Sequence, residues 1–247
     1  MNLFLDGIAW ILDPANWTGV GSIPERIGQH LLISAVVLVI ASIIALPAGV
    51  AVGHTGRGKE PAVMVSGGLR ALPTLGVLTL FALWLGIGLQ APVIALVILA
   101  IPPLLAGAYA GLESVDRRTI DAARAMGMRE DQIIGKVELP LGMPIVVGGI
   151  RSATLQIIAT ATLAAYVADF GLGRYIFAGL KTRDYAEMLG GSILVIILAL
   201  AIDGLFAITQ RLVVPHGVRA ARGAELRPGP SRSRAAVGRP ITEGNQE

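Results

Sequence analysis

The sequence contains no cysteine, which excludes disulfide bonds and thiolate metal sites. Histidine occurs only three times, and His30, His54 and His216 are isolated from one another and from any carboxylate cluster with metal-ligand spacing. No Ser-His-Asp arrangement with a strand-to-helix turn is visible either. We therefore expect no metal site and no catalytic residue on this chain.

Charge is scarce as well: Asp, Glu, Lys and Arg make up 15% of the residues, against roughly 25% in an average soluble domain. Hydrophobic residues make up 54% and gather in five stretches. Each stretch can cross about 30 Å of hydrocarbon at about 1.5 Å per helical residue. The sequence therefore predicts an all-α integral membrane protein. Its transmembrane domain, residues 27–215, is expected to be a bundle of about five transmembrane helices covering residues 27–53, 62–86, 92–111, 141–165 and 188–211.

Two prolines, Pro47 and Pro73, fall inside these stretches. Proline removes a helical hydrogen bond, but neighbouring helices can satisfy the freed carbonyl group in a membrane protein. We expect both prolines to kink their helices rather than end them.

The first segment, residues 1–26, is apolar enough to resemble a secretory signal. It lacks a basic start, contains Asp6, and has a proline directly after Asp13, where cleavage would occur. We therefore expect it to be retained. Trp10 and Trp17 favour a helix at the membrane interface on the extracytoplasmic side.

Lysine and arginine are distributed unevenly among the connecting segments. Basic residues are most frequent after the first, third and fifth predicted spans. Five crossings place those three regions on one side, and the positive-inside rule makes that side cytoplasmic. The chain is then a multi-pass protein of the inner membrane with its N-terminus outside and its C-terminus inside. The net charge of +3 is explained by this placement, so we expect membrane lipid rather than nucleic acid as the partner.

The last residues, 216–247, are rich in Arg, Gly, Pro, Ser and Ala and show no hydrophobic periodicity. Such a composition cannot bury enough apolar surface to fold. We predict a disordered cytoplasmic tail.

The loop between the third and fourth spans, residues 112–140, is too long to be a simple connection. Ser114 is a candidate N-cap, and a short helix is predicted by one narrow face of residues at helical spacing, Val115, Thr119, Ala122 and Met126. Gly127 can adopt the left-handed conformation that ends such a helix. A second short helix then runs to Pro140, the expected start of the next span, and carries on one side Ile133, Ile134 and Val137.

Two interpretations of this helix-turn-helix loop remain open from periodicity alone. Its small apolar residues, rimmed by charges, suit a surface that docks a partner at the cytoplasmic side, with the charges setting the register. The same pattern also suits a self-contained cap that lies on the bundle.

The loop contains "DAARAMG", nine further residues and then "VELP". This resembles the loop signature of binding-protein-dependent ABC importer permeases, in which E-A-A, three residues, Gly, nine residues and I-x-L-P follow one another. Asp replaces the usual Glu and Val the usual Ile, so charge and apolar character are kept. The resemblance implies that this loop is a coupling helix docked into a separate ATPase subunit, through residues Asp121, Ala122, Ala123, Gly127, Val137, Leu139 and Pro140.

Four further stretches resemble the osmoprotectant branch of that family: "FLDGIAWILDPANWTGVGSIPERIGQHLLIS", "LRALPTLGVLTL", "GLGRYIFAGLKTRDYAEMLGGSI" and "LALAIDGLF". The resemblance implies a permease subunit for glycine betaine, choline, carnitine or proline. It also implies three kinds of partner: ABC ATPase subunits that hold the ATP and magnesium, a second permease copy or paralogue, and an extracytoplasmic solute-binding protein that docks on residues 171–185. No cofactor is expected on this chain itself.

The cargo leaves no signature in the spans. Aromatic rings best hold a quaternary ammonium group, yet Phe, Trp and Tyr are only 5% of the chain, so no substrate-binding residue is assigned. An ABC importer permease for amino acids or another small solute remains an alternative. A secondary transporter or channel is a further one, although it would need intramembrane ion ligands and usually an internal repeat, neither of which is visible.

The stretch "GHTGRGKE" places Gly53, Gly58 and Lys59 at the spacing of a phosphate-binding loop. A Ser or Thr should follow to hold magnesium, but Glu60 stands there, and its carboxylate would repel phosphate. A membrane span rather than a strand precedes it. We interpret the stretch as a basic turn that anchors the first span.

Three charged residues lie inside predicted spans, where each costs roughly 2.5 to 3.5 kcal/mol at a helix centre. Arg70, Arg151 and Asp203 are all about 10 to 16 Å from the cytoplasmic ends of their helices by the helical rise. We hypothesise that Asp203 pairs with Arg151 or with Arg70. The alternative is that each side chain reaches separately toward the interface.

Overall fold

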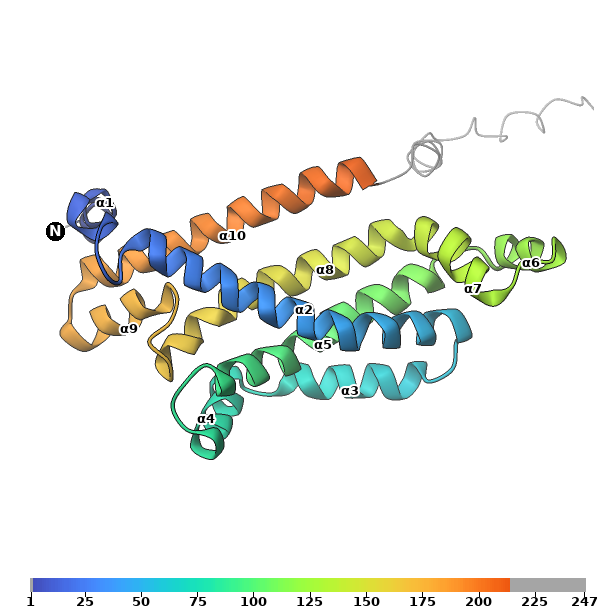
Figure 1. Ribbon diagram of the computed structural model, residues 1–247, viewed down its shortest axis with the longest axis horizontal. Coiled ribbons are helices and arrows are strands. Elements are labelled where there is room, and N and C mark those ends of the chain that lie inside the picture. Colours follow the sequence, from blue (N-terminus) through green and yellow to red (C-terminus); the bar gives the residue numbers. More distant parts are fainter. Residues whose placement is uncertain (1, 214–247) are drawn as a thin grey trace, which may run out of the picture. The chain divides into compact units, whose positions relative to one another are not determined.

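The structure is a computed structural model that describes residues 2–213 (Figure 1). The predicted tail, residues 216–247, and His216 lie outside the described residues. Within them, the regular elements are all helical, and the helices α2 (Ile23–Thr55), α5 (Gln90–Glu113), α8 (Leu139–Ala161) and α10 (Tyr185–Val213) run along the length of the bundle (Figure 1).

Four helices of the described part are long and apolar enough to cross a membrane, and a fifth span results if a bent helix pair is counted as one. These candidate spans are Ile23–Thr55, Gln90–Glu113, Glu130–Tyr166 and Tyr185–Gln210, with the bent pair at Lys59–Ala71 and Thr74–Leu85. The predicted fold class, an all-α membrane bundle of about five spans, is confirmed.

The two prolines predicted to kink their spans behave differently. Helix α2 continues through Pro47, as expected. At Pro73 the expectation is wrong: α3 (Lys59–Ala71) ends, α4 (Thr74–Leu85) begins, and the two axes differ by 83°. Pro73 disfavours helical geometry at Leu72, which is extended. The α3–α4 pair is also covered on few sides, since only two of its residues are buried, so little packing opposes the break.

The main core lies where α2, α5 and α8 pack together, and it is lined by residues such as Val37, Leu104 and Ile157. Glycine lets α5 and α8 approach closely: a Cβ atom added at Gly107 would lie 2.5 Å from the Cα atom of Gly149. These three helices therefore form a tightly packed unit.

A second, smaller core lies at the end of the bundle where α2 begins. It joins α1 (Leu3–Leu12), α9 (Gly173–Thr182) and the start of α10 around Ile23, Leu172, Tyr175 and Leu194. The rings of Trp10 and Tyr175 meet edge to face, with centroids 4.9 Å apart. The N-terminal segment is thus packed onto the bundle at this end.

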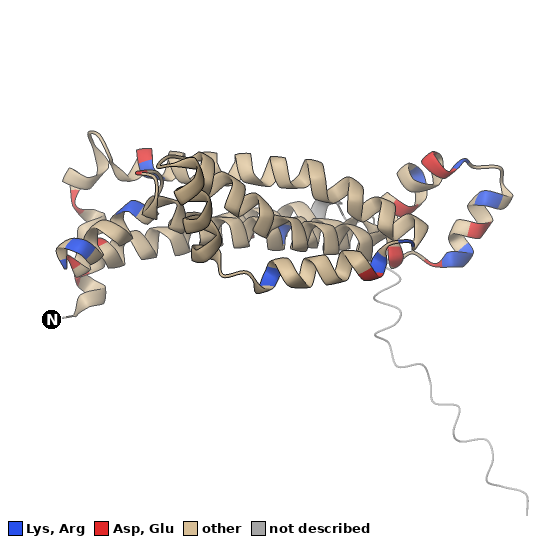
Figure 2. Cartoon of the chain, turned by 90° about the horizontal axis from the view of Figure 1, so that it is seen from below, with Lys and Arg blue, Asp and Glu red and all other residues tan. Residues whose placement is uncertain are grey.

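The opposite end of the bundle carries α6 (Arg117–Ala125) and α7 (Glu130–Ile133), followed by a π-helical turn over Ile134–Glu138 that leads directly into α8. We call residues 116–138 the elbow, and this end of the bundle the elbow end. Figure 2 shows the charged residues concentrated at the two ends of the bundle, with few between them. That distribution matches a bundle whose middle faces hydrocarbon.

Candidate functional site

The first arm of the elbow is α6, and its start differs from the prediction. Asp116, not Ser114, is the N-cap: its carboxylate accepts the N–H of Arg118 at 2.9 Å. The Ser114 hydroxyl instead donates to the Gly111 carbonyl at 2.6 Å, and α5 extends to Glu113. Ser114 therefore lies at the end of the preceding helix, and the chain turns before α6 begins.

Most of the predicted face of α6 is exposed. The predicted face included Thr119, Ala122 and Met126, but all three are exposed, and Met126 is 77% exposed. The face packed inward carries Ile120 and Ala123. The branched side chain of Ile120, next to Thr119 in the sequence, fills the inward position. Of the four residues of the predicted face, Val115 is buried in this cluster and the other three point outward.

The hinge of the elbow is Gly127, as predicted. Its φ is 83°, a left-handed conformation that L-residues adopt with strain. The N–H of Met128 donates to the Ala123 carbonyl at 3.2 Å, and the N–H of Gly127 donates to the Arg124 carbonyl at 2.9 Å. These two bonds form the Schellman motif that closes a helix end.

The second arm, α7, does not stop before the next span. It passes through the π-helical turn into α8, where Leu139 and Pro140 lie in the first turn. The N–H of Leu139 donates to the Ile134 carbonyl, five residues earlier. Pro140 therefore lies within a continuous helix rather than at a break. Such π turns occur often at functional sites.

The structure divides the seven residues of the loop signature into an outer and an inner group. Asp121, Ala122 and Gly127 are exposed, whereas Ala123 is buried. The inner group packs at the base: Val137 lies against the cluster that contains Ala123, and both Leu139 and Pro140 are half-buried in α8. The outer group is exposed and is therefore open to contact by another protein.

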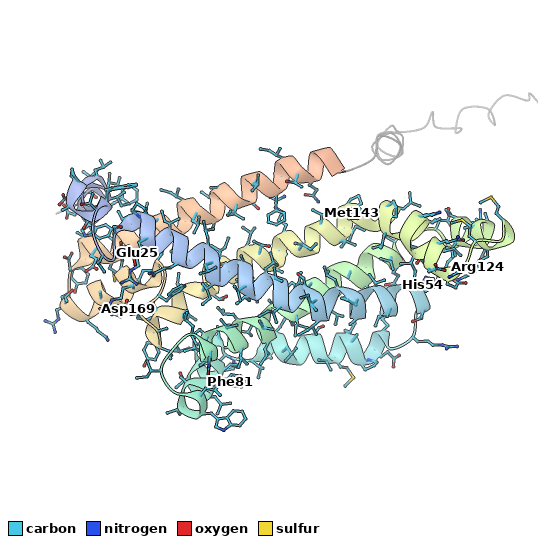
Figure 3. All side chains as sticks on the ribbon, viewed as in Figure 1. Glu25, His54, Phe81, Arg124, Met143 and Asp169 are labelled. Atoms are coloured by element: carbon cyan, nitrogen blue, oxygen red, sulfur yellow. The ribbon has the colours of Figure 1, made fainter. Side chains whose placement is uncertain are left out.

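One contact between the elbow and the bundle was not predicted from the sequence. Along the chain, His54, in the last turn of α2, is far from any carboxylate cluster with metal-ligand spacing, but the fold brings two carboxylates beside it. Its Nδ1 lies 2.6 Å from the Glu138 carboxylate and its Nε2 lies 3.1 Å from the Glu130 carboxylate. The His54 side chain is 11% exposed and that of Glu138 only 2%. Figure 3 labels His54 at the end of α2, beside the elbow that carries Arg124.

Glu130 is also held from α6. Arg124 donates through Nε and Nη2 to the two Glu130 oxygens, at 2.8 and 3.1 Å, and through Nη1 to Asp121 at 3.4 Å. This bidentate pair raises the pKa of the Arg124 guanidinium, chiefly through the hydrogen bond to Glu130, so Arg124 stays charged. Among the described residues, no group of three or more His, Cys, Asp or Glu side chains is arranged to hold a metal ion.

The charged residues inside the spans resolve into one pair. Arg151 of α8 donates to both oxygens of Asp203 of α10, with Nε at 2.6 Å and Nη2 at 2.7 Å. Each side chain is 31% exposed. Arg70 is exposed at the end of α3 and takes part in no ion pair within residues 2–213. The structure therefore pairs Asp203 with Arg151 rather than with Arg70.

The stretch with phosphate-loop spacing forms a turn between α2 and α3. Gly56 and Gly58 both have positive φ there. Lys59 forms an ion pair with Glu113 at 2.5 Å, so its ammonium group is occupied by a carboxylate of this chain. This geometry agrees with a basic turn at the membrane surface.

Comparison with known proteins adds to this geometry. The family model described as "Binding-protein-dependent transport system inner membrane component" matches residues 41–216. The chain is 35% identical over 202 residues to the glycine betaine/carnitine/choline transport system permease protein OpuCB of Bacillus subtilis (strain 168), covering 82% of this chain and 93% of the relative. It is 29% identical over 223 residues to the osmoprotectant import permease protein OsmW of Salmonella typhimurium, covering 87% of this chain and 100% of the relative.

Among solved structures, the MetNI methionine ABC transporter in inward-facing conformations has a chain that matches this one with a TM-score of 0.68. The match covers 84% of this chain and 98% of that chain, at 22% sequence identity. At this identity the likeness establishes a common fold and nothing more.

Proposed function

Because the chain belongs to the binding-protein-dependent transport system inner membrane component family, and is thus a permease subunit of an ABC importer, we propose that it carries a quaternary ammonium osmoprotectant. The relatives' names point to glycine betaine, choline or carnitine. Proline stays a prediction from the sequence resemblance. ATP is hydrolysed on a separate subunit, so this chain is a transport subunit rather than an enzyme.

The elbow is the part of this chain that docks into the ATPase subunit. The observation that carries this proposal is the outward stripe of Thr119, Ala122 and Met126 beside the Gly127 hinge, in which Ala122 belongs to the loop signature of the family. Small side chains let a partner surface approach the helix closely, while the charged residues around them set the register. The elbow also has its own apolar core, so it can be displaced as a unit without unfolding.

The proposed orientation places the elbow end in the cytoplasm, where ATP is available. The turn between α2 and α3 and the elbow both carry lysine and arginine and lie at this end, which agrees with the positive-inside rule because that rule depends on where Lys and Arg lie rather than on net charge. The opposite end of the bundle would then face the extracytoplasmic side. There the solute-binding protein would dock on residues 171–185, which include α9 and reach the start of α10.

A second copy or a paralogue would complete the path for the solute. The α3–α4 pair supports this proposal because it exposes a large apolar surface, including Met64, Leu80, Leu83 and Trp84. Part of that surface faces lipid and part can face the second permease. Closure of the ATPase subunits on ATP would move the two elbows and shift the bundles between inward-open and outward-open states.

Docking through the elbow is tested with Ala122→Glu. A long charged side chain in the stripe should prevent the ATPase subunit from approaching, so ATPase co-purification and ATP-driven uptake of labelled glycine betaine should fall about tenfold or more, equivalent to about 1.4 kcal/mol of docking free energy. Ala15→Glu is the matched control, since Ala15 is exposed at the opposite end. Unchanged co-purification and uptake in Ala122→Glu would contradict docking through this face.

The cargo is tested separately in wild-type proteoliposomes that contain the ATPase and the solute-binding protein. Competition by unlabelled choline, carnitine, proline and methionine against labelled glycine betaine ranks the solutes. Strong competition by the quaternary ammonium compounds supports the proposal. Competition by methionine alone would assign the chain to amino-acid import.

A further inference from the structure

The elbow is joined to the bundle by the chain itself at two places only. It follows α5 at one side and continues through the π-helical turn into α8 at the other. Its apolar core consists of Ile120, Ala123 and Ile133, with Val115 from just before the elbow, and this cluster is separate from the main core of the bundle. A displacement of α6 would therefore be transmitted to α5 and α8 through the backbone, whereas no covalent connection leads directly from the elbow to α2.

His54 supplies a connection to α2. It stands in the last turn of that helix, and both of its ring nitrogens contact carboxylates of the elbow: Glu138 in the π-helical turn at 2.6 Å and Glu130 at the start of α7 at 3.1 Å. Because Glu138 is almost completely buried, water cannot replace the imidazole as its partner. The π turn is what places this carboxylate beside α2 at the start of a membrane span.

The connection continues outward to the docking face. Glu130 is held by Arg124, and Arg124 reaches Asp121, the first residue of the loop signature. Five side chains thus form an unbroken polar chain from the outer arm of the elbow to α2, namely Asp121, Arg124, Glu130, His54 and Glu138.

On the α2 side, the contact reaches a part of the helix that is firmly packed. A Cβ atom added at Gly53 would lie 2.8 Å from the Tyr109 carbonyl oxygen and 2.9 Å from the Leu112 Cβ. The last turns of α2 and α5 therefore touch backbone to backbone, and any displacement of His54 must move both helices together.

We propose that His54 and Glu138 are positioning residues for the conformational change that moves the solute. They hold the elbow against the end of α2, so that a displacement imposed at α6 moves α2 and α5 together with α8 as one body. The inference rests on the proposed function, because it needs an ATPase that displaces the elbow. It assigns to His54, which the family signature does not include, the task of passing that displacement on.

The test measures solute transported per ATP hydrolysed, in proteoliposomes that hold the full complex of permease, ATPase subunits and solute-binding protein. Singly, His54→Leu and Glu138→Leu should lower this ratio about fivefold or more while ATP hydrolysis continues, the size expected for loss of coupling between two sites. Lys59→Gln and Glu113→Gln are matched controls, because that pair joins α3 to α5 at the same end without contacting the elbow.

The double variant His54→Leu/Glu138→Leu separates transmission from folding. His54→Leu leaves the buried Glu138 carboxylate unpaired, and Glu138→Leu leaves Nδ1 of His54 unpaired, whereas the double variant leaves neither and should regain thermal stability. On our proposal the transport-to-ATP ratio stays low in the double variant, because the link to Glu130 and Arg124 is still absent.

Two results would overturn the inference: a ratio within about twofold of wild type in the single variants, which is too small for allosteric coupling, or a ratio that recovers with stability in the double variant. A wild-type complex without any ATP-driven uptake would instead remove the proposed function itself. The two failures are therefore distinguishable.

Discussion

The two ends of α2 are held by different kinds of contact. At the end where α2 begins, polar side chains of the helix bind main-chain groups: His30 Nε2 contacts the Ile158 carbonyl at 3.0 Å, and the N–H of Leu172 donates to His30 Nδ1 at 3.3 Å. Arg26 donates to the main-chain carbonyl of Asp169 and also pairs with the Asp169 carboxylate, each at 3.0 Å, so the purely main-chain contacts at this end are those of His30. Figure 3 labels Asp169 beside the start of α2. At the elbow end, His54 binds only side chains, the carboxylates of Glu130 and Glu138.

The two kinds of contact allow one end of α2 to stay fixed while the other end moves. A main-chain partner cannot leave unless its backbone is rearranged, so the contacts of His30 define a fixed joint. Carboxylates can change rotamers and exchange partners at lower cost, so the contacts of His54 define a joint that can open and re-form. In the proposed transport cycle, the elbow end is the one that moves.

The largest effect on stability is expected at His30, at the fixed end of α2. His30→Leu removes the partner of the Ile158 carbonyl and of the Leu172 N–H, two groups that are buried with it. Each unpaired main-chain group costs about 1 to 3 kcal/mol. Because two groups lose their partner, the free energy of unfolding should fall by about 2 to 6 kcal/mol. Unfolding in detergent followed by fluorescence measures it.

The functional readout of this variant then separates the two joints. We expect transport and ATP hydrolysis to fall together in His30→Leu, in proportion to the folded fraction, whereas His54→Leu lowers their ratio. A His30 variant that keeps its stability but loses coupling would mean that both ends of α2 transmit motion, and the comparison would fail.

A smaller effect is expected at the contact between α8 and α10, where Arg151 and Asp203 form a side-chain pair of the exchangeable kind. Asp203→Asn leaves the guanidinium of Arg151 without its carboxylate, but both side chains are partly exposed, and Arg151 can reach toward the membrane surface. Stability should therefore fall less than in His30→Leu. The exchanged pair Arg151→Asp/Asp203→Arg should restore it, and Arg70→Gln should have no effect on it. Thermal unfolding of the four proteins decides this, since an unrestored exchange would mean that the position, not the pairing, is important.

Local features of this fold could be predicted from the sequence wherever one residue type determines the backbone. Gly127 is such a residue, because its left-handed hinge follows from its lack of a side chain. Pro47 and Pro73 show the limit of this reasoning, since the same residue type continues one helix and breaks another according to how well each is packed. The contact between His54 and Glu138 could not be predicted, because 84 residues separate them and only the assembled bundle brings them together. The sequence offered one hint: Glu138 lies at the start of a membrane span, where a carboxylate needs a partner.

The smallest effect is expected from Tyr175→Phe, which removes one bond at the fixed end. The Tyr175 hydroxyl donates to the Gly21 carbonyl at 2.6 Å, and a bond of this kind contributes about 0.5 to 1.5 kcal/mol to the free energy of unfolding. Burial raises the pKa of this phenol to about 12, above its value of about 10 in an unfolded chain.

Because the folded state then binds this proton more tightly than the unfolded state, the contribution of Tyr175 is fully present below about pH 10 and is lost as the pH rises toward about 12. The stability difference between wild type and Tyr175→Phe should therefore be constant at neutral pH and shrink above about pH 10. Denaturant unfolding of both proteins across this range measures it, with Tyr185→Phe, an exposed tyrosine, as the control. A difference that does not change with pH would show that the hydroxyl is solvated, and the main-chain contacts at the fixed end would then be fewer than the geometry indicates.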